Sequence, residues 1–291
     1  MENKNWYDKY YKIMFIIPII IFLISIIYLF SFHARTGDLI YRDTSLSGGT
    51  IITLQGSYDI ASLESSLKQS IPDVSIRGIS ELTSGREIAV IIESSVSPEQ
   101  LKPAIESALN TKLTDENSST EFSGPSLGDN FYRQLITSLI ISFILMSLVI
   151  FVMFRSFIPS IAIIFAAFAD IVMPLALLDY MGIKISAAGI AAFLMLIGYS
   201  VDTDILLTTR VIKKREGTVN QRIYGAFKTG IFMTITALLA VLPAFFLVTT
   251  IPDSFRQIFL ILALGLFADI LNTWFTNAGI IKWYAGKKGL N

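Results

Sequence analysis

Cysteine is absent from the 291-residue sequence, and histidine occurs only once, at His33. Without cysteine the chain can form neither a disulfide framework nor a thiolate metal site, and a single histidine lacks companion ligands for a metal ion. The sequence also has no Gly-x-x-x-x-Gly-Lys-Ser/Thr loop for nucleotide phosphates and no serine, histidine and acid set for nucleophilic catalysis. These absences argue against an enzyme, and we expect no cofactor. Work done by the protein would draw on an ion gradient or on the ATPase of a partner.

Charged residues are scarce and apolar residues abundant, at 16% and 53% of the chain. A globular protein of this composition would have difficulty staying in solution. A bilayer core about 30 Å thick needs roughly 20 mostly apolar residues for each crossing helix. Six runs of that length occur: Ile13–Phe32, Leu135–Phe154, Ile158–Leu178, Ile185–Thr208, Tyr224–Val248 and Ile258–Ile281. The sequence therefore predicts an α-helical polytopic membrane protein with six transmembrane helices.

The short segments outside these runs carry their basic residues unevenly, and the positive-inside rule converts this bias into an orientation. Lys184 and Arg256 are the only basic residues on one side. The other side holds Lys4, Lys9, Lys12, Arg155, Arg210, Lys213, Lys214, Arg215, Arg222, Lys282, Lys287 and Lys288. We therefore expect both termini to be cytoplasmic in a multi-pass protein of the cell membrane. The first run is too long for a secretory signal and precedes a poor cleavage site, so we expect it to be an uncleaved anchor.

The segment between the first two runs, residues 33–133, shifts abruptly to Ser, Glu, Asp and Thr. It is long enough to fold by itself, and the orientation places it outside the cell. Its pattern predicts, in order, a strand at Thr50–Gln55, a helix at Ile60–Gln69, strands at Val74–Ile79 and Glu87–Ile92 joined by a turn at Thr83–Gly85, a helix at Pro98–Leu109 and a strand at Thr120–Ser123. That order fits an α+β ferredoxin-like domain. Its excess of acidic residues disfavours binding of nucleic acid.

The predicted domain plan follows from these boundaries. Residues 1–32 form the cytoplasmic N-terminus and the first transmembrane helix, and residues 33–133 form the external ferredoxin-like domain. Residues 134–281 contain transmembrane helices two to six, and residues 282–291 form a cytoplasmic tail.

Four acids interrupt the apolar runs, and they are the strongest candidates for function. An ionisable group inside a membrane costs roughly 2.5–3.5 kcal/mol on insertion scales, so it usually marks an ion path, a proton relay or a substrate path. The four are Asp170, Asp202, Asp204 and Asp269. At about 1.5 Å per residue, Asp170 and Asp269 are expected near mid-bilayer, and Asp202 roughly 9 Å from the cytoplasmic end of its helix. The alternative is that these acids only pair with one another or with threonine hydroxyls and so fix helix packing.

Asp202 and Asp204 are two residues apart and therefore point to nearly opposite faces of one helix. We expect one of them to face the bundle centre and the other to face a partner helix or cytoplasmic water. Lys228 lies at a depth similar to that of Asp202 near the start of the fifth run. An ion pair between Asp202 and Lys228 is geometrically feasible if their helices are neighbours.

The fourth run resembles a known family signature. Residues Ile190 to Asp204, with Arg210 and Arg215-Glu216 beyond them, resemble the signature of the SecF branch of the SecD/SecF protein-export family, which belongs to the resistance-nodulation-division superfamily. The motif positions are Gly198, Tyr199, Ser200, Thr203 and Arg210. Gly48 and Gly49 fall where the family opens its external domain, and Gly124 and Pro125 fall where it closes that domain. Asp170 falls where the family has an acid in the third helix.

The resemblance implies a function and partners. It implies an accessory subunit that acts with SecD at a SecYEG-type channel and uses the proton or sodium gradient to help the emerging preprotein across the membrane. It also implies six helices of the resistance-nodulation-division architecture, completed by SecD. A half-transporter of the same superfamily that moves lipids or small amphiphiles is the alternative. A length of 291 residues argues against that alternative, because such transporters fuse two six-span halves.

Departures from the bacterial pattern leave the relay acid undecided. The bacterial pattern Gly-Tyr-Ser-x-Asn-Asp-Thr places its acid where this sequence has Thr203, between Asp202 and Asp204. Lys228 replaces a family arginine, which keeps the charge and loses the guanidinium fork. The usual histidine before the acid of the third helix is Ala169. These differences resemble archaeal members of the family.

Overall fold

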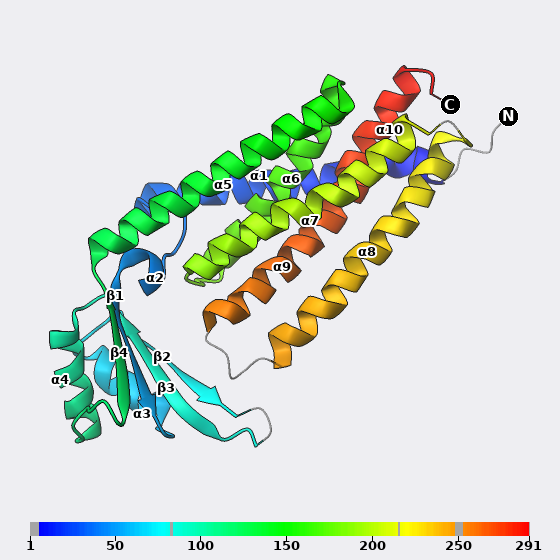
Figure 1. Ribbon diagram of the computed structural model, residues 1–291. Helices are drawn as coiled ribbons and strands as arrows, with labels where there is room; N and C mark the ends of the chain where they lie inside the picture. Colours follow the sequence, from blue (N-terminus) through cyan, green and yellow to red (C-terminus); the bar gives the residue numbers. More distant parts are fainter. Residues whose placement is uncertain (1–5, 82–83, 215, 248–252, 291) are drawn as a thin grey trace.

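The computed structural model describes residues 6–81, 84–214, 216–247 and 253–290. Helices dominate this part of the chain, and a small four-stranded sheet lies at one end of a long helical bundle (Figure 1). Four residues used in the sequence analysis fall outside the described part: Lys4, Thr83, Arg215 and Val248.

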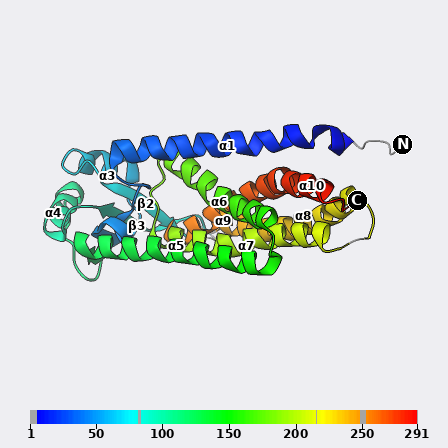
Figure 2. The same cartoon turned by 90° about the horizontal axis from the view of Figure 1, so that it is seen from above.

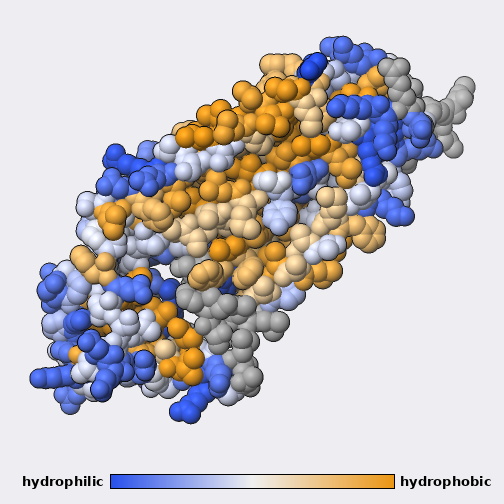
Figure 3. Space-filling view, viewed as in Figure 1, coloured by the Kyte–Doolittle hydropathy of each residue, from blue (hydrophilic) through white to orange (hydrophobic). Residues whose placement is uncertain are grey.

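Six helical spans in the described part are long and apolar enough to cross a membrane, which confirms the predicted number. Five are single helices, and the sixth consists of α9, a π-helical segment η1 and α10. Their bounds are α1 Trp6–Thr36, α5 Pro125–Phe154, α6 Phe157–Tyr180, α7 Ala187–Ile212, α8 Val219–Leu247, α9 Asp253–Leu271, η1 Asn272–Asn277 and α10 Ala278–Lys287. The space-filling view shows a broad apolar band along the bundle with hydrophilic residues at both ends (Figure 3), as expected for a chain in a bilayer.

The spans differ in how much of their surface other helices cover. Most of α6, and more than half of α7 and of the sixth span, is buried within the chain, whereas α1, α5 and α8 are largely exposed. Seen from above, α1 and α5 lie on opposite sides of the bundle (Figure 2). Helices α6, α7 and α9 therefore form the centre, where polar side chains are best shielded from lipid.

The small domain follows α1 and precedes α5. It contains α2 Thr44–Ser47, β1 Gly49–Gln55, α3 Ile60–Lys68, β2 Ser75–Ser80, β3 Glu87–Ser94, α4 Pro98–Leu109 and β4 Ser118–Ser123. The strand order is β2-β3-β1-β4, and every neighbouring pair is antiparallel. Buried side chains from the two longer helices and the sheet form its core, among them Ile52, Leu63 and Leu101. The predicted order of strands and helices is thus observed, and β1, one of the two central strands, is the one that follows α1 and α2.

Candidate functional site

Three of the four intramembrane acids meet in the centre of the bundle. Asp170 on α6, Asp204 on α7 and Asp269 on α9 are each completely buried. We call these three side chains the acid cluster. Hydroxyl and amide groups from α7, α8 and η1 surround the acid cluster. Each of the three acids accepts hydrogen bonds from at least two of these groups.

Asp170 accepts hydrogen bonds on both carboxylate oxygens. The Ser200 hydroxyl of α7 donates to Oδ2, and the Asn272 amide of η1 donates to Oδ1 at 2.6 Å. The Asp170 carboxylate therefore joins three different parts of the bundle.

Asp269 and Asp204 share a threonine hydroxyl. The Thr273 Oγ1 atom lies 2.9 Å from Asp269 Oδ1 and 2.9 Å from Asp204 Oδ1. A hydroxyl has only one proton to donate, so it cannot satisfy two ionised carboxylates at once. Thr203 adds a second hydroxyl 2.9 Å from Asp269 Oδ1, and the Asn277 amide donates to Asp204 Oδ1 at 2.7 Å.

The π-helical segment η1 supplies much of this polar lining. Asn272, Thr273 and Asn277 are at most 1% exposed, and all three contact an acid of the cluster. A π-helical turn is rare and occurs often at functional sites. These three residues were not among the candidates predicted from the sequence, although their spacing along the chain indicates a polar helical face. From Asp269 the polar residues recur at three, four, seven and eight positions further on, a helical stripe in an otherwise apolar span.

Among the residues that the structure describes, the acid cluster has unused hydrogen-bond acceptors and lacks a basic partner. In the described part of the chain, no Lys or Arg forms an ion pair or a hydrogen bond with these acids. Three buried oxygens there have no hydrogen-bond partner: Asp204 Oδ2, Asn272 Oδ1 and Asn277 Oδ1. No three Asp, Glu or His side chains within the described ranges are arranged to hold a metal ion.

The ion pair between Asp202 and Lys228 that the sequence left feasible does not form in the described part of the chain. Both side chains are exposed, and no salt bridge joins them in the part of the chain that the structure describes. The helices α7 and α8 are neighbours, but Asp202 points away from the bundle because it lies about 200° around the helix from the buried Asp204.

The remaining motif residues of α7 divide between two faces. Gly198 and Tyr199 lie with Asp202 on the exposed face, whereas Ser200 and Thr203 lie on the buried face. Arg210 donates to the carbonyl oxygen of Gly225 at 2.5 Å and so ties the end of α7 to α8.

The glycine motif positions lie where the small domain meets the bundle. Gly48 has a φ of +77°, and a Cβ atom there would lie 2.7 Å from the Pro125 backbone. A Cβ on Gly128 would likewise lie 2.5 Å from the nitrogen of Gly48. Gly49, at φ +144°, would place a Cβ 2.4 Å from the Ser94 carbonyl oxygen. Pro125 is the first residue of α5 and Gly124 caps it, so two backbones approach here without side chains between them.

A buried acid cluster in a six-span bundle defines a multi-pass membrane protein with a polar intramembrane site. Residues 104–287 match the family model for the C-terminal region of the protein export membrane proteins SecD and SecF. The chain is 37% identical to the protein-export membrane protein SecF of Pyrococcus furiosus, over 95% of this chain and 92% of that protein. It is 36% identical to SecF of Methanocaldococcus jannaschii over 95% and 96% of the two chains.

The chain therefore belongs to the SecD/SecF family of protein-export membrane proteins, as a SecF-like subunit. The sequence resemblance is confirmed, and the half-transporter alternative is not favoured. A solved structure with the same fold is SecDF of Thermus thermophilus, with a TM-score of 0.72 and 19% identity. The similarity covers 96% of this chain and 38% of that longer chain.

Proposed function

We propose that the acid cluster is the ion relay of a SecF-like subunit that promotes preprotein translocation. One observation supports this most directly: three fully buried carboxylates from three spans meet, and no Lys or Arg of the described residues forms an ion pair with them. Burying an unpaired charge costs several kcal/mol, so three neighbouring negative charges need protons or a small cation to neutralise them. The shared Thr273 hydroxyl is satisfied when one of the two carboxyl groups carries a proton and donates it back.

The proposed relay works by changing the charge of the cluster. Uptake of a positive charge weakens the repulsion among Asp170, Asp204 and Asp269, and its release restores the repulsion. Because these acids come from α6, α7 and α9, a change in charge alters how the three central helices pack. Export of a preprotein into energised membrane vesicles tests the relay. Replacing each acid with asparagine should remove the gradient-stimulated part of export and leave the basal part.

We place the small domain outside the cell, where a preprotein emerges. The uneven basic residues of the loops support cytoplasmic termini, and the observed strand order supports a ferredoxin-like fold for residues 33–133. A SecYEG-type channel would deliver the preprotein to this domain. Cysteine accessibility tests the orientation: a membrane-impermeant maleimide should label Asp115→Cys in intact cells and should fail to label Lys288→Cys until the cells are opened.

We propose that SecD covers the exposed face of α7. An acid that faces lipid costs roughly 2.5–3.5 kcal/mol, and a second membrane subunit removes that cost by burying it. Asp202 with Gly198 on α7, and Lys228 on α8, leave polar or small groups on the outside of this chain. This chain matches only 38% of the longer Thermus SecDF chain, so the rest of that chain corresponds in size to a second subunit.

Replacing Asp202 should weaken this association without unfolding the chain. Asp202→Leu removes a side chain that has no ion-pair partner within the described chain, so the thermal midpoint of the isolated subunit should not fall. Polar contacts between transmembrane helices contribute about 1–2 kcal/mol, so affinity for SecD in nanodiscs should drop roughly 5–30-fold. Ile27→Ala, at a lipid-facing position of α1 that is 67% exposed, is the matched control and should leave affinity unchanged. Equal affinity for both variants would contradict the proposed interface.

A further inference from the structure

A short segment before β1 joins the membrane bundle to the small domain. We call residues 37–48 the strap. It contains α2 and ends at Gly48, directly before β1, one of the two central strands of the sheet. Its side chains Ile40 and Leu46 are buried in the largest core cluster of the bundle, together with Ile185 of the segment before α7. The strap is therefore packed as part of the bundle, although the chain continues from it into the sheet.

The strap is bonded to the start of α7 through its backbone. Ile185 donates to the Tyr41 carbonyl oxygen at 2.6 Å, and Asp43 donates to the Ile185 carbonyl oxygen at 3.1 Å. The two bonds form a parallel bridge between Arg42 and Ile185.

A side chain of the strap also occupies the first turn of α7. The Ala187 backbone donates to Ser45 Oγ at 3.0 Å, and that hydroxyl donates to Asp43 Oδ1 at 2.5 Å. Burial raises the pKa of the Asp43 carboxyl, and hydrogen bonds from Ser45 oppose the rise. Ser45 thus satisfies one of the amides that a helix start leaves without a partner.

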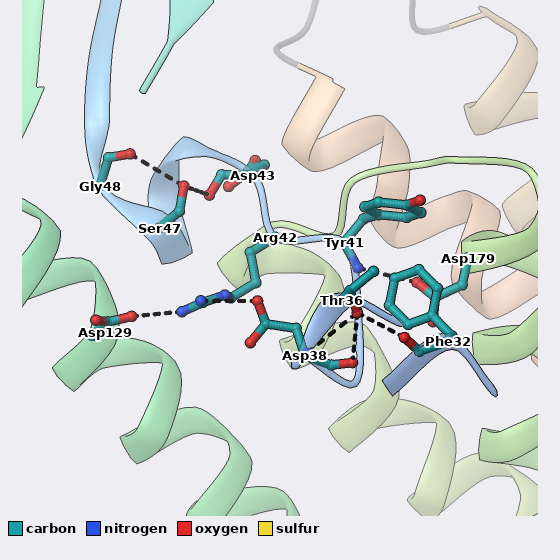
Figure 4. Close-up of polar contacts among 10 residues, drawn as sticks. All are labelled: Phe32, Thr36, Asp38, Tyr41, Arg42, Asp43, Ser47, Gly48, Asp129 and Asp179. Carbon is teal, nitrogen blue, oxygen red and sulfur yellow. Dashed lines mark hydrogen bonds and ion pairs between the residues drawn. The ribbon is translucent and has the colours of Figure 1, made fainter. Parts of the chain in front are cut away.

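The helix α6 reaches the strap through Asp179. This residue is 1% exposed, and its Oδ1 accepts the Tyr41 backbone amide at 3.1 Å (Figure 4). Asp179 lies nine residues beyond Asp170 on the same helix, about 14 Å along its axis.

The helix α9 reaches the same place through Gln257. Its Oε1 accepts the Ser186 amide at 2.8 Å and the Ser186 hydroxyl at 2.7 Å, and its Nε2 donates to the Lys184 carbonyl oxygen at 2.6 Å. Gln257 therefore forms hydrogen bonds with the residues on both sides of Ile185.

The strap also forms an ion pair with α5, at the point where the chain leaves the small domain. Arg42 pairs with Asp129 of α5 at 2.6 Å and with Asp38 of the strap at 3.0 Å (Figure 4), and it lies 5.0 Å from the ring of Tyr132. Entry to the small domain and exit from it are thereby held together.

At the ends nearest the small domain, α6 and the start of α7 are bonded directly to the strap. Helix α9 is bonded through Gln257 to the residues just before α7 that hold the strap. We propose that the strap is the rigid link that carries a displacement of α6, α7 and α9 to strand β1, with Ser45 and Asp179 as its positioning residues. This inference rests on the proposed ion relay. Because β1 is bonded to both β3 and β4, a displacement of the strap moves the sheet as a unit.

A distance measurement between two spin labels tests the link. The chain has no cysteine, so labels attach only at introduced thiols. Asp115→Cys is on the exposed surface of the small domain, and Phe30→Cys is on α1, which carries none of the acids and is 72% exposed there. In the complex with the partner subunit, Asp204→Asn fixes one acid of the cluster as neutral and should shift the distance distribution.

The same shift is then measured with the strap weakened. The double variant Ser45→Ala and Asp179→Ala removes the two side-chain bonds to α7 and α6, and we expect the Asp204→Asn shift to disappear. Ser45→Thr keeps a hydroxyl and should keep the shift, which separates loss of the bond from general damage. A shift that persists in the double variant would overturn the link and leave the relay standing. No shift with an intact strap would overturn the link, and gradient-stimulated export with Asp204→Asn would then decide separately whether the relay stands.

Measurements of preprotein export distinguish a loss of coupling between the bundle and the small domain from a loss of folding. The double variant should keep basal export and lose the gradient-stimulated part, while Ser45→Thr should retain both. Equal loss of basal and stimulated export in the double variant would show a merely structural role and would overturn the link.

Discussion

Replacing Asp204 with asparagine is expected to reduce gradient-stimulated preprotein export to the level seen without a gradient. The side chain keeps its size and can still accept from Thr273 and Asn277, which are its two observed partners. It can no longer gain or lose a charge, so the cluster loses one member of the relay. The measurement is translocation of a preprotein into inverted membrane vesicles or proteoliposomes that contain the partner subunit and the channel, with and without an imposed gradient.

The control for this experiment is another acid in the same chain. Asp115→Asn changes an exposed acid of the small domain and should leave both parts of export intact. Asp202→Asn distinguishes the effect of the exposed acid of α7 from that of the buried Asp204. It neutralises the exposed carboxylate and leaves the buried cluster unchanged. Full gradient stimulation in Asp204→Asn, Asp170→Asn and Asp269→Asn would show that these acids only hold the helices together.

Replacing Gly48 with alanine is expected to destabilise the whole chain. The position has a φ of +77°, where a side chain is strained, and the new Cβ would lie 2.7 Å from the Pro125 backbone. Backbone strain of about 1–3 kcal/mol and overpacking of about 1–3 kcal/mol together predict a loss of roughly 2–6 kcal/mol in the free energy of unfolding. Thermal unfolding in detergent, followed by aggregation or intrinsic fluorescence, measures the fall in midpoint.

Gly85→Ala is the matched control for Gly48→Ala. Gly85 also has a positive φ, +65°, but a Cβ there meets nothing within 4 Å. Its substitution should lower the free energy of unfolding only through backbone strain, by about 1–2 kcal/mol. Similar midpoints for the two variants would show that the tight junction with α5 adds nothing to stability.

The sequence predicted the architecture well because the bilayer and the sheet impose simple periodicities. Each of the six apolar runs became a helical span, and most extended a few residues beyond the run, because a helix does not stop where the hydrocarbon stops. The alternation of strand and helix patterns between Gly49 and Ser123 was recovered to within two residues at each end.

Contacts between helices were less predictable, since a sequence gives the depth of a residue and not the neighbour that it faces. Depth alone suggested that Asp202 meets Lys228, whereas rotation about α7 turns Asp202 outward and Asp204 inward. The meeting of Asp170 with Asp269 depends on how α6 packs against α9. The π-helical turn at Asn272–Asn277 was likewise not predicted from the sequence.

The depth of the acid cluster makes it sensitive to voltage as well as to concentration. Asp170 lies roughly 20 Å from one end of α6 and 15 Å from the other, so an ion that reaches the cluster has crossed about half of the membrane. Moving one charge through 100 mV changes its free energy by about 2.3 kcal/mol, and half of that drop changes occupancy by about sevenfold. For the proposed relay, we therefore expect a membrane potential of about 100 mV to change the ion occupancy of the cluster by about sevenfold, even with equal ion concentrations on both sides.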